Sequence, residues 1–179
     1  MVGDRPSHLI LRYKNGALSW DKVVAWGLHA RPGWLFQRSE SSVVIEYRIG
    51  NNLELDEMIE LYRASTLGER RPVDDGERMA TMLRNANLVV TAWDAKLLVG
   101  IARSLTDFST VIYLSDLAVR VSHQHLGIGK ELIRRTQQAG GRHTRIVLLA
   151  APAAVNYYPH VGFTQHSSAW TLGPGDFLR

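Results

Sequence analysis

Two glycines at the start of a predicted helix have the residue type and spacing that most clearly suit a chemical role. The segment around them runs from Val111 to Gly129 and reads VIYLSDLAVRVSHQHLGIG. An apolar, strand-like run ends at Val119, and after a short polar turn Gly127 and Gly129 open the helix. Glycines in such a turn expose backbone N–H groups at the positive end of the helix dipole. Because bare amides in that position bind phosphate, we expect a ligand that carries a diphosphate.

Two common phosphate-binding loops do not fit this spacing. A Walker A loop requires Ser or Thr after Gly-Lys, whereas Gly129-Lys130 is followed by Glu131, whose charge would repel a phosphate. A dinucleotide-binding fingerprint requires a third glycine for close packing of helix on strand, and Leu132 occupies that position. Both interpretations are therefore excluded.

The segment instead resembles the GNAT superfamily of N-acetyltransferases, in which Gln/Arg-x-x-Gly-x-Gly/Ala follows a strand ending in Leu-Ala-Val. Gln124, Gly127 and Gly129 match that signature in register. The resemblance implies acetyl-coenzyme A as cosubstrate, with its diphosphate on the loop amides and its pantetheine arm paired with the strand backbone. The residues expected to bind it are Leu117, Ala118, Val119, Gln124, His125, Leu126, Gly127, Ile128, Gly129 and Lys130.

The resemblance covers the chain from about Val44 to Leu172 and also implies the fold. We expect an α/β (α+β) domain with a mixed, mostly antiparallel central sheet flanked by helices, in which a splayed strand pair holds the cofactor. Apolar periodicity in the sequence is consistent with this fold. It predicts strands at 43–49, 88–93, 97–105, 111–119, 145–150 and 169–172.

The same pattern places three helices and a hairpin between these strands. Segments 51–54 and 74–77 resemble capping boxes, and each precedes a helix with one apolar face. The second and third strands meet across 94–96 and are expected to form a hairpin. The helix that begins at the paired glycines is expected to run over 127–139 and to end at Gly140-Gly141.

A second match to the family supplies a candidate acid. Tyr158 lies four residues before Gly162 in YYPHVGF, which resembles the family's Tyr-x-x-x-Gly-Phe, and the resemblance implies that this tyrosine protonates the departing coenzyme A thiolate. Its other interpretation is a packed tyrosine with a satisfied hydroxyl. Pro159 makes the local helix short or kinked, which leaves Tyr157 as an alternative donor. Ala151 stands where many members have Asn, and this costs a pantetheine contact.

Asp116 is the candidate general base, because it lies on the strand that borders the predicted cofactor site. Alternation along that strand places it on the face opposite Leu117. The other interpretation is a structural carboxylate that accepts hydrogen bonds, and the sequence leaves both open.

Arg70 and Arg71 lie between the first two helices, a region that usually covers the acceptor site in GNAT proteins. Two adjacent guanidiniums could hold a carboxylate or phosphate of the acceptor. The alternative is that the two arginines belong to an exposed charge cluster and pair with Asp74 and Asp75.

Charge is concentrated at one end of this 179-residue chain. Residues 1–42 carry six Lys/Arg and three Asp/Glu, so they account for most of the net charge of +4. They also hold Trp20, Trp26 and Trp34. We interpret residues 1–42 as an N-terminal extension, or alternatively as an arm that docks on the core or on a partner, and residues 43–179 as the GNAT domain.

Composition narrows the expected setting and partners. The chain has no cysteine, no apolar run as long as a membrane span and no segment typical of a signal peptide, so a cytoplasmic protein is expected. The histidine spacing does not predict a metal site. The near-neutral core argues against nucleic acid as partner, and the family makes a homodimer plausible.

The sequence therefore predicts an acetyl-coenzyme A-dependent N-acetyltransferase that acts on a small-molecule or peptide amine. The alternative is a coenzyme A-binding sensor or interaction module with little turnover. A basic nucleic-acid binder would rest only on the charge of residues 1–42.

Overall fold

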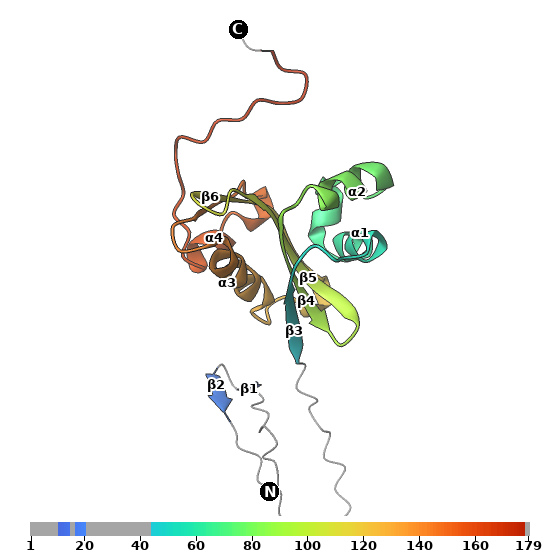
Figure 1. Ribbon diagram of the computed structural model, residues 1–179, viewed down its shortest axis with the longest axis vertical. Helices are drawn as coiled ribbons and strands as arrows, with labels where there is room; N and C mark the ends of the chain where they lie inside the picture. The colour runs from blue at the N-terminus through green and yellow to red at the C-terminus, as the bar shows by residue number, and fades with distance from the viewer. Residues whose placement is uncertain (1–10, 15–16, 21–43, 178–179) are drawn as a thin grey trace, which may run out of the picture.

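One mixed sheet forms the centre of the domain, and helices cover both of its faces (Figure 1). The computed structural model describes residues 11–14, 17–20 and 44–177. The strand order is β3-β4-β5-β6-β7, and all neighbours pair antiparallel except β6 and β7, which run parallel. The strands are β3 (Ile45–Ile49), β4 (Leu88–Asp94), β5 (Leu97–Thr106), β6 (Val111–Val119) and β7 (Arg145–Val147). The predicted fold class is confirmed.

Helices α1 and α2 lie on one face of the sheet, and α3 and α4 lie on the other (Figure 1). The α-helices are α1 (Leu55–Arg63), α2 (Gly76–Arg84), α3 (Ile128–Gly140) and α4 (Tyr157–His160). Three short 3-10 helices are η1 (Thr66–Arg70), η2 (Val121–His123) and η3 (Pro152–Ala154). None of the helices in the described ranges is both long and apolar enough to cross a bilayer.

The N-terminal extension predicted for residues 1–42 lies largely outside the described residues, and its role stays a prediction. Within it, β1 (Leu11–Lys14) and β2 (Ala17–Trp20) form an antiparallel pair. Val43, the expected first residue of the domain's first strand, is also outside the described ranges.

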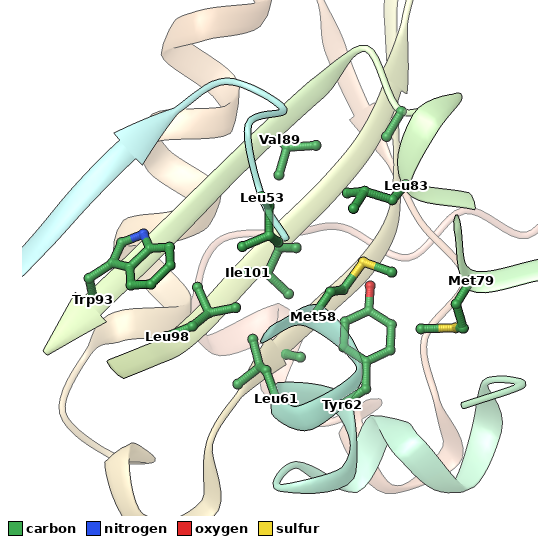
Figure 2. Packing of buried hydrophobic residues seen from close by; sticks show 12 residues of the cluster. Leu53, Met58, Leu61, Tyr62, Met79, Leu83, Val89, Trp93, Leu98 and Ile101 are labelled. Atoms are coloured by element: carbon green, nitrogen blue, oxygen red, sulfur yellow. The ribbon is translucent and has the colours of Figure 1, made fainter. Parts of the chain in front are cut away.

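Two buried clusters join the helices to the sheet. On the α1 face, Tyr62 and Met58 project from α1 and Met79 from α2 toward the strands (Figure 2). On the other face, α3 packs closely because Gly100 of β5 has no side chain. A Cβ there would lie 3.0 Å from Leu132 Cδ1 and 3.1 Å from Ile128 Cγ2, so these α3 side chains would have to shift.

A bulge in β6 decides which face its polar side chains occupy. Arg103 pairs with Asp116, but the next residue of β5 pairs with Leu114, so Ser115 is an extra residue on β6. Leu114 therefore packs on the α3 face, whereas Asp116, two residues later, faces α1. Without the bulge, alternation would place both side chains on the same face.

Most predicted elements are confirmed, including the hairpin across 94–96 and the helix that ends at Gly140, with Gly141 as its C-cap at φ 100°. Both predicted capping boxes are wrong in detail. Glu54 is the N-cap of α1 and makes no side-chain cap bond, while the Asn51 amide donates to the Leu83 carbonyl in α2 and to the Ala86 carbonyl just after it. The N-cap of α2 is Asp75, one residue after the predicted position.

Two predicted strands also differ from the structure. Of the predicted strand 145–150, only the three residues of β7 form a strand. β7 lies at the edge of the sheet and is partly exposed. Residues 169–172 form no strand, and the Trp170 side chain is 92% exposed. A strand needs a neighbour to satisfy its N–H and C=O groups, and the described residues give this segment none.

Candidate active site

The glycine-containing turn predicted from the sequence forms the start of α3. Gly127 is the N-cap in the left-handed conformation, with φ 79°, and His125 is also left-handed, with φ 64°. No side chain of the described residues caps the first turn of α3. Its orphan amides therefore point outward at the positive end of a 13-residue helix. Lys130 lies in the same turn and is exposed.

The turn between β6 and α3 is tied to β6 itself and to the β4–β5 hairpin, which lies at the same end of the sheet. The Gln124 side chain donates to the Val119 carbonyl at 3.2 Å, and the His123 ring bonds Asp94 of the β4–β5 hairpin at 3.2 Å. Gln124, which matches the family signature, thus holds the turn against the strand. Its predicted contact with the ligand stays a prediction.

The edge of β6 beside this turn is open over the predicted pantetheine-binding residues. β7 pairs with β6 only from Val111 to Tyr113, and no other described strand takes its place along Leu114–Val119. Leu117 and Val119 are half-buried, whereas Ala118 is buried on the α1 face. Side chains bond two carbonyls of this segment, Arg71 at Ser115 and Gln124 at Val119, but the segment has no strand partner on this side among the described residues, so an extended ligand arm could pair with it.

The two tyrosines of α4 occupy different positions. The Tyr158 ring makes T-shaped contacts with the rings of Tyr157 and Phe163, with 5.5 Å between ring centroids in each pair. Burial raises the pKa of Tyr158, so its hydroxyl keeps the proton at neutral pH. Tyr157 instead places its hydroxyl against Gly129 in the first turn of α3. The prediction that Pro159 shortens the helix is confirmed, since α4 has four residues.

Asp116 is buried and accepts three hydrogen bonds from side chains. Its Oδ2 atom accepts from the Tyr62 hydroxyl at 2.8 Å and from Arg103 Nε at 2.5 Å, and Oδ1 accepts from Arg71 at 2.6 Å. Two guanidinium groups and a phenol thus donate hydrogen bonds to the two carboxylate oxygens. These contacts favour the structural alternative over a general base, which would need a free lone pair beside the amine.

Arg70 and Arg71, the predicted acceptor-binding arginines, differ in their contacts. Besides bonding the buried carboxylate, Arg71 donates to the Ser115 carbonyl at 2.9 Å and to the Arg70 carbonyl at 2.8 Å. Arg63, not Arg71, pairs with Asp74 at 2.8 Å. Arg71 therefore fixes its loop to β6, and only the exposed Arg70 side chain is directed to solvent.

Sequence reasoning missed Tyr62 and Arg103, the other two members of this polar cluster. Tyr62 falls on the buried face of α1, where the apolar pattern predicts only a core residue. Arg103 had a usable signal, because it is the one charged residue in the strand LLVGIARSLT. A charge in a buried strand requires a partner, and Asp116 is the matching charge in the next strand.

Alkaline pH is expected to destabilise the protein through Tyr62, which is buried, and Tyr47, which is half-buried. Burial and the neighbouring Asp116 charge raise the pKa of Tyr62 well above its ordinary value, and burial raises the pKa of Tyr47 to about 12. The folded state thus holds these protons more tightly than the unfolded state. Their stabilising contribution is complete below pH ~10 and is lost as the pH rises toward the folded-state pKa. Urea unfolding between pH ~9 and ~12 would measure this, with a shallower decline expected for Tyr62→Phe; an identical decline in that variant would contradict the assignment.

With this geometry in view, comparison with known proteins identifies the class. A family model described as an acetyltransferase (GNAT) domain matches residues 69–171. An uncharacterized N-acetyltransferase ycf52-like from Prochlorococcus marinus is 31% identical over 129 residues, which cover 68% of this chain and 63% of that protein. The chain thus spans less than two thirds of the length of this relative.

Solved structures show the same fold. A probable acetyltransferase of unknown function from meticillin-resistant Staphylococcus aureus superposes with a TM-score of 0.62 at 20% identity, covering 73% of this chain and 98% of that one. An aminoglycoside N-acetyltransferase in complex with CoA has a TM-score of 0.57 at 17% identity, covering 73% and 95%. These likenesses establish the fold, and the matched family model establishes the family. The chain belongs to the GNAT family of acetyltransferases.

Proposed function

We propose that this protein transfers an acetyl group from acetyl-coenzyme A to an amine by direct attack in a ternary complex. The observation that carries the proposal is the open edge of β6 beside the uncapped first turn of α3. The turn offers amides to a diphosphate, and the edge offers a strand backbone to the pantetheine arm. The family to which the chain belongs supports the same ligand.

The residues present fit this cosubstrate in a specific way. Gly127 has a positive φ that a side chain would strain, and the space around it is open, so a phosphate can approach the backbone closely. Glu131, whose charge argues against a Walker A loop, forms ion pairs with residues of its own helix. It accepts from Arg134 and Arg135, whose hydrogen bonds and charges hold its pKa below the ordinary value.

Acetyl-coenzyme A supplies the acetyl group as an activated thioester. The backbone of Leu117–Val119 would orient it, and the two bound reactants would then react locally rather than by collision, which contributes up to about 7–11 kcal/mol in well-oriented systems. The amine nitrogen forms a bond to the carbonyl carbon as the carbon–sulfur bond breaks. The Tyr158 hydroxyl would donate its proton to the sulfur, and solvent would accept the proton released by the amine and restore the phenol.

Asp116 has a different part in this proposal. Its two arginine partners and Tyr62 leave it as a positioning residue that joins the loop after η1 to β6. The exposed Arg70 at the end of η1 then becomes the candidate contact for a carboxylate or phosphate on the acceptor. An acidic small-molecule or peptide amine is the acceptor class that this placement supports.

A second candidate function is coenzyme A binding without efficient turnover. Ala151, where many family members carry Asn, and the packing of Tyr158 between two aromatic rings favour it. The two functions share the ligand and differ only in whether thiol is released.

The test is calorimetry with coenzyme A, followed by thiol detection with acetyl-coenzyme A and a panel of acidic and neutral amines. The protein is expected to bind coenzyme A and to release thiol when an acceptor is added. Gly127→Glu should lose binding by about 10-fold or more, since a carboxylate would then compete for the amides. Gly76→Glu is the matched control, because Gly76 begins α2 and a Cβ there meets open space. Binding without thiol release would favour the second function, and no binding would overturn both.

A further inference from the structure

Tyr157 reaches from α4 to the first turn of α3. A Cβ built on Gly129 would lie 2.9 Å from the Tyr157 hydroxyl oxygen and 3.6 Å from the ring carbon that bears it. Gly129 thus leaves room for this hydroxyl, which adds a reason for the second glycine of the turn beyond backbone freedom. The hydroxyl oxygen is the only part of Tyr157 that an alanine at that position would crowd.

The Cβ position built on Gly129 is also close to a side chain at the end of β6. The side-chain atom Val119 Cγ2 lies 3.8 Å from the Cβ position of Gly129, so the Tyr157 hydroxyl lies near the place where the end of β6 meets the first turn of α3. In the proposed function, the strand edge binds pantetheine and the turn binds diphosphate. The hydroxyl therefore lies at the junction between these two parts of coenzyme A.

Tyr157 also retains what a hydrogen-bond donor needs. Its side chain is 37% exposed, so a ligand can reach it, while burial of the rest of the ring and the neighbouring Tyr158 raise its pKa. The phenol keeps its proton at neutral pH and can donate to an anionic oxygen. Tyr158, one residue on, is held edge-on against Phe163. The two adjacent tyrosines are thus placed for separate tasks.

We propose that the Tyr157 hydroxyl donates a hydrogen bond to a diphosphate oxygen of coenzyme A bound on the Gly127–Gly129 turn. This inference rests on the proposed function and assigns to the site a residue outside the glycine signature. Tyr157 is a binding residue in this account, whereas the acid is Tyr158.

Calorimetry on Tyr157→Phe with two probes tests the assignment. Coenzyme A should bind about 10- to 100-fold more weakly than to the wild-type protein, the usual effect of losing a hydrogen bond to a charged group. Pantetheine, which lacks the diphosphate, should bind equally to both proteins when measured by competition. Tyr113→Phe is the control, because Tyr113 is a similarly exposed tyrosine on β6. Unchanged affinity for coenzyme A, or an equal loss for pantetheine, would overturn the inference.

The double variant with Gly129→Ala gives an independent check. Alanine alone should displace the hydroxyl and weaken coenzyme A binding, but it should add no further loss in the Tyr157→Phe background, because no oxygen remains to crowd. Additive losses would show that the two residues act separately and would contradict the inference. Absence of coenzyme A binding by the wild-type protein would instead reject the proposed function itself, so the two failures are distinguishable.

Discussion

Replacing Asp116 with alanine is expected to lower the free energy of unfolding by about 3–5 kcal/mol, the usual cost of removing one partner of a buried ion pair. The carboxylate is fully buried, and Arg103, whose side chain is 6% exposed, would lose the partner of its charge. Arg71 and Tyr62 would lose a hydrogen bond each. Unpaired buried charge is costly because neither water nor another anion can replace the carboxylate there.

Urea denaturation of Asp116→Ala beside Asp74→Ala would measure this effect. Asp74 also pairs with an arginine, but at the surface, where its side chain is 92% exposed, so its loss should cost no more than about 1 kcal/mol. Asp116→Asn adds a kinetic readout, and the acidic limb of its pH–rate profile should persist. A stable Asp116→Asn protein that has lost this limb would contradict the structural role and restore Asp116 as the base.

Replacing Tyr158 with phenylalanine is expected to lower kcat by about 10²–10⁴-fold, with little change in the KM for acetyl-coenzyme A. The substitution keeps the ring that packs against Tyr157 and Phe163 and removes only the proposed proton donor. Without it, the thiolate would depart unprotonated, and the reverse attack on the new amide would compete with product release. Thiol release under saturating acceptor would measure both constants.

Tyr157→Phe supplies the matched comparison, since the two tyrosines are adjacent and share an edge contact. The assignments predict opposite patterns: a fall in kcat for the Tyr158 variant and a rise in KM for the Tyr157 variant. The reverse pattern would make Tyr157 the acid. Unchanged turnover in both variants would remove the tyrosines from the chemistry.

The fold class and the glycine turn could be predicted because their signals are local. A strand, a polar turn and paired glycines lie within Val111–Gly129, and backbone geometry there depends on neighbours in the chain. The hairpin across 94–96 and the end of α3 at Gly140 follow from the same short-range rules. The failed strand at 169–172 shows the limit, because a strand also needs a partner that no local pattern supplies.

The hydrogen-bond partners of Asp116 could be found only from the tertiary structure. Its partners Tyr62, Arg71 and Arg103 lie 54, 45 and 13 residues away in the chain, and the bulge at Ser115 turns it toward them. A one-residue slip in that strand would have directed the same carboxylate to the opposite face. The sequence by itself thus determined the family, the glycine-containing turn and most elements, whereas the pairing of charges was set by long-range packing, which joins groups that the chain keeps far apart.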